Sequence, residues 1–162
     1  MSHDAPFAPH DHAACAADAL AAARQVCAEK GVRLTEARER VLSILLESHA
    51  ALGAYEVLER LREDGRAAAP PAAYRALDFL CAHGLAHRIE KLSAFVACGR
   101  LQGEAAGAPA FLICRVCRQV AETSAAPALR ALAAQAEAYG FAFERGVVEI
   151  EGLCPACRED RA

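Results

Sequence analysis

The sequence predicts an α+β protein in two parts, a helical N-terminal part and a smaller, mixed C-terminal part. Three observations lead to this fold class. Apolar residues recur with the period of amphipathic helices over the first half of the chain, they then alternate with a period of two, and two Cys-x-x-Cys pairs lie in the last third. We expect a mobile tail over 1–12, a first domain over 13–98, a hinge linker over 99–109 and a second domain over 110–162.

Four helices are expected in the first domain, and each has a residue that marks its start or its end. Glycine after a periodic segment ends a helix, threonine before one serves as an N-cap, and proline suits the first helical turn. In chain order the expected helices are Ala13–Lys30 before Gly31, a helix after Thr35, a helix between Gly53 and Gly65, and a helix from Pro70 to Gly84.

Strands replace helices after this point. Leu85, His87 and Ile89 share one face of an expected strand, residues 91–93 turn the chain, and residues 94–98 return as a second strand. Three short helices followed by such a hairpin form the winged helix-turn-helix arrangement. The helix from Pro70 is then the one that enters the DNA major groove, and the hairpin is the wing.

The second domain is expected to be small and to need support. Its predicted elements are a strand over Phe111–Cys114, a strand over Gln119–Thr123, a helix from about Pro127 to Tyr139 and a strand over Phe141–Glu151. A piece of roughly 50 residues buries too little surface to be stable alone. We expect a metal ion to tie its ends and a second copy of the chain to cover its open face.

Four of the eight cysteines form two close pairs, Cys114 with Cys117 and Cys154 with Cys157. A Cys-x-x-Cys turn brings two thiolates to one metal ion, and two such turns complete a tetrahedral zinc site. One pair alone is also typical of a redox motif, but two pairs in a small chain favour one zinc ion. The other four cysteines lie in apolar segments and are interpreted as buried packing residues: Cys15, Cys27, Cys81 and Cys98.

Composition excludes several classes of function. The chain shows no export signal, so its eight cysteines indicate reduced thiols and a cytoplasmic protein. No apolar run reaches the roughly 18 residues that a membrane span requires. Lys and Arg total 18 against 21 Asp and Glu, a net charge of −3. Overall charge therefore does not hold this protein to nucleic acid, although a local basic face would.

The predicted major-groove helix supplies the DNA-binding candidates. Arg75 lies opposite the apolar stripe of this helix, and Tyr74 lies at its border. Arginine pairs with guanine or a phosphate, and a tyrosine hydroxyl reaches phosphate. The plain alternative is a solvated helix face. Lys30 and Arg33 belong to a basic cluster near the second helix and are further candidates.

Taken together, these segments resemble the ferric uptake regulator (Fur) family, and within it the zinc uptake regulators (Zur). The matching segments are GVRLT at 31–35, PPAAYRALDFL at 70–80, GLAH at 84–87, FLICRVC at 111–117 and GLCPAC at 152–157. The resemblance covers residues 14–158 in order. The helix motif and the paired cysteines together make it specific.

The resemblance implies a homodimeric winged-helix repressor that binds double-stranded operator DNA and controls zinc homeostasis genes. It implies two zinc ions per chain, a structural one in the four-cysteine site and a regulatory one at the hinge, which favours the DNA-binding arrangement. By position, the regulatory ligands are His87, Cys98 and Glu122, and these donor types suit Zn(II). It implies neither a membrane partner nor a small organic substrate.

The sequence departs from the family pattern at one ligand position. Gly107 stands where the family usually has a histidine, about seven residues before the first cysteine pair. Glu104 is the first candidate for the vacant position, and the other candidates are a water molecule, His83, His3, His10 and His12. The histidine cluster of iron-sensing members is also missing, which favours zinc over iron.

Three other interpretations compete with this one. A family member that senses another metal or an oxidant is the first, and Cys98 argues against an iron-based peroxide sensor. A zinc deaminase is the second, but the chain has no His-x-Glu motif, and four thiolates leave zinc no open position. A zinc-binding redox or protein-interaction module is the third, and it leaves Tyr74 and Arg75 unexplained. We therefore expect a DNA-binding regulator and not an enzyme.

Overall fold

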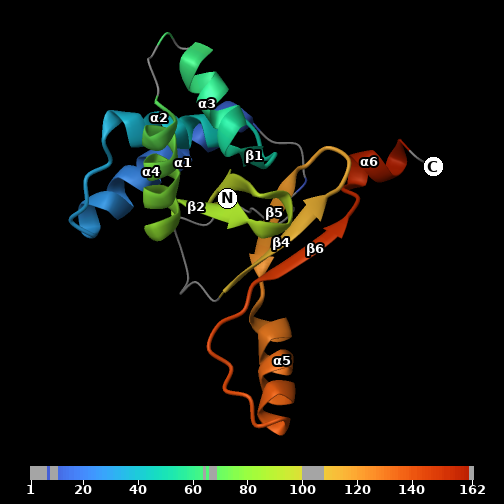
Figure 1. The fold of residues 1–162 in the computed structure, drawn as a ribbon. Helices are drawn as coiled ribbons and strands as arrows, with labels where there is room; N and C mark the ends of the chain where they lie inside the picture. The colour runs from blue at the N-terminus through green and yellow to red at the C-terminus, as the bar shows by residue number, and fades with distance from the viewer. Residues whose placement is uncertain (1–6, 8–10, 64, 66–68, 100–107, 161–162) are drawn as a thin grey trace.

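The computed structural model describes residues 7, 11–63, 65, 69–99 and 108–160. The first four helices gather in the N-terminal part, and the second sheet lies beside it (Figure 1). In chain order the elements are α1 (His12–Glu29), α2 (Glu36–Leu45), β1 (Leu52–Gly53), α3 (Ala54–Glu63), α4 (Pro70–Ala82), β2 (Ala86–Ile89), the 3₁₀ helix η1 (Glu90–Leu92), β3 (Ala94–Ala97), β4 (Pro109–Cys114), β5 (Val120–Ser124), α5 (Ala126–Ala138), β6 (Val148–Gly152) and α6 (Pro155–Glu159).

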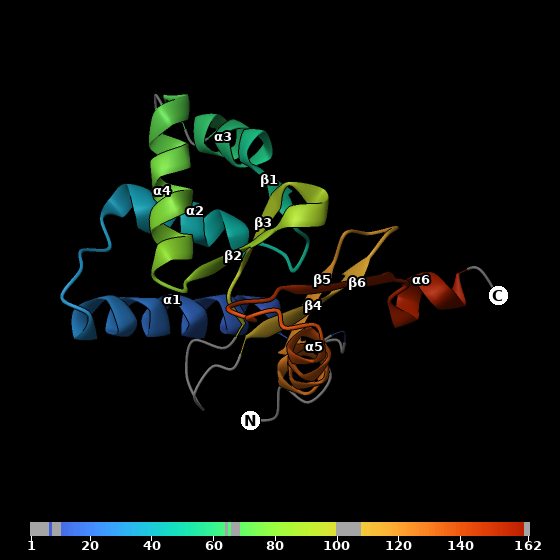
Figure 2. The same cartoon turned by 60° about the horizontal axis from the view of Figure 1, so that its bottom comes forward.

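The N-terminal helices form around one apolar core. The Thr35 hydroxyl caps α2 by accepting a hydrogen bond from the Arg38 amide at 3.5 Å, as the sequence predicts. Leu42, Leu77 and Leu80 are fully buried where α2 and α4 meet. An antiparallel sheet in the order β1-β3-β2 closes this core (Figure 2). The winged helix-turn-helix arrangement is therefore confirmed.

The C-terminal part is built on a second three-stranded sheet, in the order β5-β4-β6. Strand β4 is central and pairs with β5 antiparallel and with β6 parallel. The antiparallel β5 returns the chain to the starting end of β4, and α5 with residues 139–147 connects β5 to β6 on the opposite edge. Helix α5 extends away from the rest of the molecule (Figure 1) and contains no buried residue.

The last strand is shorter than predicted. We expected it to span Phe141–Glu151, but β6 begins only at Val148, and residues 141–147 form no regular structure. Strand β4 offers a partner only from the Ala110–Val148 pair onward, so the preceding residues have no ladder to join. The chain also turns closely over α5, where a Cβ at Gly146 would lie 2.6 Å from the Leu129 Cδ2 atom.

The two parts share a second apolar cluster. It is formed by buried residues of both: Ala51, Ile89, Ala94 and Val96 from the N-terminal part, and Phe111, Ile113 and Val120 from the C-terminal part. Backbone hydrogen bonds join the same parts, from the Val120 amide to the His49 carbonyl at 2.9 Å and from the Ala51 amide to the Arg118 carbonyl at 3.0 Å. The domain limits 13–98 and 110–162 therefore stay a prediction.

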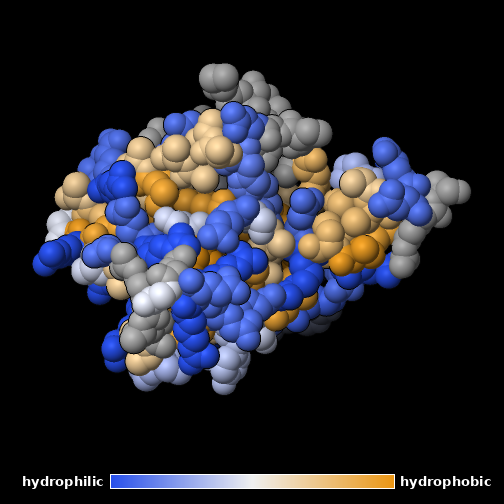
Figure 3. All heavy atoms as spheres, turned by 90° about the horizontal axis from the view of Figure 1, so that it is seen from above, coloured by the Kyte–Doolittle hydropathy of each residue, from blue (hydrophilic) through white to orange (hydrophobic). Residues whose placement is uncertain are grey.

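Apolar residues are exposed on the surface of both the N-terminal and the C-terminal part. Seen from above, hydrophobic residues are exposed over the helical part and at the end that carries α6 (Figure 3). None of the helices in the described part of the chain combines the length and the apolar character that crossing a membrane requires.

Truncation of a core leucine tests this packing. Leu77 is 0 % exposed, so Leu77→Ala should lower the free energy of unfolding by about 2–5 kcal/mol, measured by urea denaturation. The exposed Glu59 on α3 provides the control, because Glu59→Ala should change stability by about 0.5 kcal/mol or less. Equal effects of the two substitutions would contradict the assignment of the core.

Candidate metal centres and nucleic-acid interface

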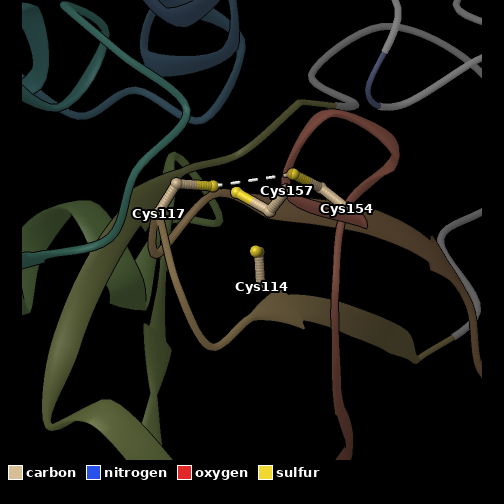
Figure 4. A group of neighbouring side chains, drawn as sticks. All are labelled: Cys114, Cys117, Cys154 and Cys157. Atoms are coloured by element: carbon tan, nitrogen blue, oxygen red, sulfur yellow. Dashed lines mark hydrogen bonds between the residues drawn. The ribbon is translucent and has the colours of Figure 1, made fainter. Parts of the chain in front are cut away.

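Four thiols converge where β4 ends and α6 begins. Cys114 ends β4, Cys117 lies in the turn that follows, and Cys154 and Cys157 lie at the start of α6. The four side chains point toward one another (Figure 4), and their Sγ atoms lie within 4.8 Å of one another. The parallel pairing of Cys114 with Gly152 brings the two turns together. Four sulfurs so placed fit a closed tetrahedral metal site.

The electrostatics of the cluster favour a cation among the sulfurs. Burial raises the pKa of Cys114, but hydrogen bonds from the backbone of Cys154, Cys117 and Val116 outweigh this and lower its pKa to about 6. Hydrogen bonding to Cys154 first, and then burial, raise the pKa of Cys157 to about 12. Without a cation, one thiolate therefore suppresses the ionisation of its neighbours. A divalent ion would relieve this repulsion.

A second cluster lies at the hinge between the two sheets. His87 comes from β2, Cys98 follows β3 and Glu122 comes from β5, and their ligand atoms lie within 4.8 Å of one another. The Glu122 Oε2 atom lies 3.3 Å from His87 Nε2 and 3.7 Å from Cys98 Sγ. It also accepts a hydrogen bond from the Gly99 amide at 3.2 Å. The three residues implied by the resemblance are thus brought together.

The hinge cluster holds a proton where a metal would bind. Burial lowers the pKa of His87, but the neighbouring Cys98 thiol and Glu122 carboxylate raise it more, to about 9. Burial raises the pKa of Glu122, and the hydrogen bond to His87 lowers it more, so this carboxyl titrates below its ordinary value. Metal-free protein at neutral pH therefore contains an imidazolium–carboxylate pair. A metal ion must displace the imidazole proton to bind.

The candidates for a fourth hinge ligand fall into two groups. Glu104, Gly107, His3 and His10 lie outside the described residues. His83 ends α4 and packs its ring against Phe79 at 4.3 Å. His12, in contrast, lines a cavity of about 440 Å³ that also borders Cys98, Gly99 and His49. Of the histidines that the structure describes, His12 and His49 therefore both border this cavity together with Cys98, while the hinge cluster itself consists of His87, Cys98 and Glu122.

The DNA-binding candidates lie on or near α4. Arg75 is exposed, and Tyr74 is 42 % exposed. Lys30 and Arg33 are exposed too, but the Lys30 ammonium donates to the His83 carbonyl at 2.8 Å and so caps the end of α4. The structure places Arg33 and Lys30 on the segment that joins α1 to α2.

The family model described as "Ferric uptake regulator family" matches residues 29–151. The chain belongs to the ferric uptake regulator family. Among curated relatives, the zinc uptake regulation protein of Escherichia coli (strain K12) is 38 % identical over 143 residues, 88 % of this chain and 83 % of that protein.

Solved structures of zinc regulators have the same fold as this Fur-family chain. A zinc uptake regulator complexed with zinc and DNA has a TM-score of 0.82 at 36 % identity, over 90 % of this chain and 97 % of that chain. The holo form of XcZur has a TM-score of 0.76 at 38 % identity, over 86 % of this chain and 96 % of that one. The apo form of XcZur gives 0.52 at 36 % identity, over 90 % and 99 %. This chain is therefore more similar to the holo arrangement.

Two contacts of this Fur-family chain escaped the sequence analysis. The Arg38 guanidinium stacks over the Phe79 ring at 3.6 Å from its centroid, which ties α2 to α4. The Gly99 amide supports Glu122, so a residue of the predicted linker belongs to the hinge cluster. Both contacts join segments that are far apart in sequence, and no local pattern indicates such pairs.

The hinge pair predicts a pH dependence in metal-free protein. His87 should titrate near pH 9 instead of its ordinary 6.5, and Glu122→Gln should lower that midpoint because the carboxylate is lost. The folded protein binds the His87 proton more tightly than the unfolded chain does. The stabilisation from protonated His87 is therefore fully present below pH 6.5 and is lost as the pH rises through about 9. Glu122 loses its effect as the pH falls below 4.5.

The stability difference between the parent and Glu122→Gln should therefore be largest between pH 4.5 and 6.5. Urea unfolding at several pH values measures this difference, and NMR of the imidazole nitrogens gives the midpoint. Glu137→Gln, an exposed change on α5, serves as the control. If His87 titrates with the same midpoint in Glu122→Gln as in the parent, the pairing of His87 with Glu122 is contradicted.

Proposed function

We propose that this chain is a zinc-responsive, DNA-binding transcriptional repressor of zinc uptake and homeostasis genes, acting as a homodimer in the cytoplasm. One observation carries the proposal: His87 and Cys98 from the wing meet Glu122 from the other sheet, within 4.8 Å of one another. A nitrogen, a thiolate and a carboxylate suit Zn(II). The relatives named as zinc regulators, one of them complexed with zinc and DNA, support it.

The regulatory step is a linkage between zinc and domain arrangement. His87 and Cys98 belong to the wing sheet, whereas Glu122 belongs to the C-terminal sheet. An ion that needs all three ligands binds the closed arrangement better than any open one and so raises its population. A fourth ligand completes the site, and His12 is supported by the cavity that it shares with Cys98.

The four cysteines hold a second, structural zinc ion in this proposal. Cys114 and Cys117 belong to the β4 turn, and Cys154 and Cys157 belong to α6. Their zinc would join the segments that follow the parallel strands β4 and β6 and would leave no open position for a reactant. The role is therefore stabilisation and not catalysis.

The face of α4 meets the DNA major groove. Tyr74 and Arg75 are exposed there, and we assign them to base or phosphate contacts. Arg33 contributes to phosphate contacts, and Lys30 does so besides capping α4. Two copies present two such helices, whose separation must match successive major grooves of an operator.

The dimer surface is supported by apolar residues that this chain alone leaves uncovered. On and next to α5, Leu132 is 51 %, Tyr139 89 % and Phe141 64 % exposed, and Ile150 on β6 is 51 % exposed. Exposed apolar residues grouped on one element mark a contact surface. A second copy, related by two-fold symmetry, would cover them.

The regulatory site is tested by counting zinc. The parent should contain two zinc ions per chain and fall to one after mild chelation. Cys98→Ser should contain one and should lose zinc-dependent DNA binding, measured by fluorescence anisotropy. Cys81→Ser, which changes another thiol of the same part, should behave like the parent.

Two outcomes would contradict the regulatory half of this proposal. One is a parent whose single zinc ion never changes, even after zinc is resupplied. The other is a Cys98→Ser protein that responds to zinc as the parent does.

The DNA face is tested by Arg75→Ala. Loss of a bidentate arginine contact costs about 1–3 kcal/mol, so operator affinity should fall by about 5- to 150-fold. Zinc content and dimer mass should not change. Arg130→Ala removes an exposed arginine from α5 and is the matched control. Equal affinity of the two variants would remove Arg75 from the interface.

A further inference from the structure

Three residues form a row across the C-terminal sheet. Phe111 in the central strand β4 pairs with Glu122 of β5 on one side and with Glu149 of β6 on the other. Paired residues on neighbouring strands point to the same face of a sheet. We name Glu122, Phe111 and Glu149 the cross-strand row.

Every member of the cross-strand row contacts the wing. Glu122 meets His87 and Cys98 at the hinge cluster. The Phe111 ring packs against the His87 ring, with 5.1 Å between centroids. Glu149 accepts hydrogen bonds from the Glu90 amide at 2.7 Å and from the Lys91 amide at 2.9 Å. The row therefore supports the wing from its metal ligands to its turn.

The Glu149 contact is specific in its geometry. Each of its two carboxylate oxygens accepts one backbone N–H, and these bonds bridge 59 and 58 residues of sequence. Hydrogen bonds to an ionised acceptor are stronger than neutral ones. The nearby pair of Lys91 with Glu151 is longer, at 3.5 Å, and both side chains are well exposed, so it contributes little.

We infer that Glu149 is a positioning residue for the hinge metal site. Its carboxylate holds the wing against the C-terminal sheet before any metal binds. Its contacts involve no hinge ligand, so they act equally in metal-free protein. They raise the fraction of molecules in which His87 and Cys98 already face Glu122. The apparent metal affinity scales with that fraction. This inference rests on the proposed zinc response.

Two further polar contacts between the two parts lie at a different place. Arg118 pairs with Glu56 at 3.4 Å, and the Val120 amide donates to the His49 carbonyl. These contacts hold the segment around β1 and the start of α3, and not the turn of the wing. Removal of the Glu149 carboxylate therefore leaves the wing turn with the exposed Lys91–Glu151 pair and the packing of Leu92, while the contacts around β1 stay.

The test compares Glu149→Ala with the parent and with Glu59→Ala, which removes an exposed carboxylate of α3. Zinc affinity of the exchangeable site is measured by competition with a chromophoric chelator, with zinc alone and no DNA. Glu149→Ala removes both hydrogen bonds to the wing turn and should bind zinc about tenfold more weakly, a loss that the modest net contribution of such bonds accounts for. Glu149→Gln, which keeps one acceptor oxygen, should lie between Glu149→Ala and the parent.

Two further measurements separate positioning from general damage. Amide hydrogen exchange of Glu90 and Lys91 should be faster in Glu149→Ala, whereas the four-cysteine zinc should stay bound. At saturating zinc, DNA affinity should return to that of the parent, because excess metal restores the closed population. A loss of DNA affinity that persists at saturating zinc would contradict the inference, since it would indicate a DNA contact or a folding defect.

Failure of the inference differs from failure of the proposed function. If the parent binds exchangeable zinc and Glu149→Ala binds it equally well, Glu149 is no positioning residue and the zinc response stands. If the parent has no exchangeable zinc, the zinc response and the inference are both wrong.

Discussion

The rest of this structure depends on the apolar contact between the wing hairpin and the C-terminal sheet. Ile89 and Val96 of the wing are buried against Phe111 and Ile113 of the sheet. Each such side chain contributes about 1.5–3 kcal/mol when it is removed from water. This contact brings β2 and β3 against β4 and β5, and the hinge ligands sit at its edge. Their meeting is therefore a consequence of packing and does not require the metal to assemble them.

The same contact places charged groups where they are costly to bury. His87 and Glu122 have side chains only 20 % and 15 % exposed. Burial opposes the charge on each, and their mutual contact, Cys98 and the Gly99 amide together offset this cost. Apolar packing thus favours the closed arrangement, whereas the cost of desolvating its charged edge reduces the free-energy preference for that arrangement. A system balanced in this way responds to a ligand that favours one of its states.

Local signals in the sequence predicted most of the elements and the wing hairpin, but not the pairing of segments that are far apart in the sequence. Thr35 and the Pro70 start of α4 mark helix boundaries by local chemistry, and the structure has both. The start of β6 depends on where β4 offers a partner, so the predicted strand from Phe141 was wrong. The cysteine pairs signal a cluster by spacing alone. His87, Cys98 and Glu122 came from the family resemblance, because their proximity arises from strand register between distant segments.

Strand register also connects the four-cysteine cluster to the hinge. The pairing of Cys114 with Gly152 next to the cluster continues along the same two strands to the pairing of Phe111 with Glu149. A slip of β6 by one residue would turn Glu149 to the opposite face of the sheet, away from the wing. A metal ion held by cysteines on both β4 and α6 opposes such a slip, because α6 follows β6 directly. The four-cysteine cluster is thus connected to the hinge cluster through the geometry of one sheet, although the two clusters share no residue.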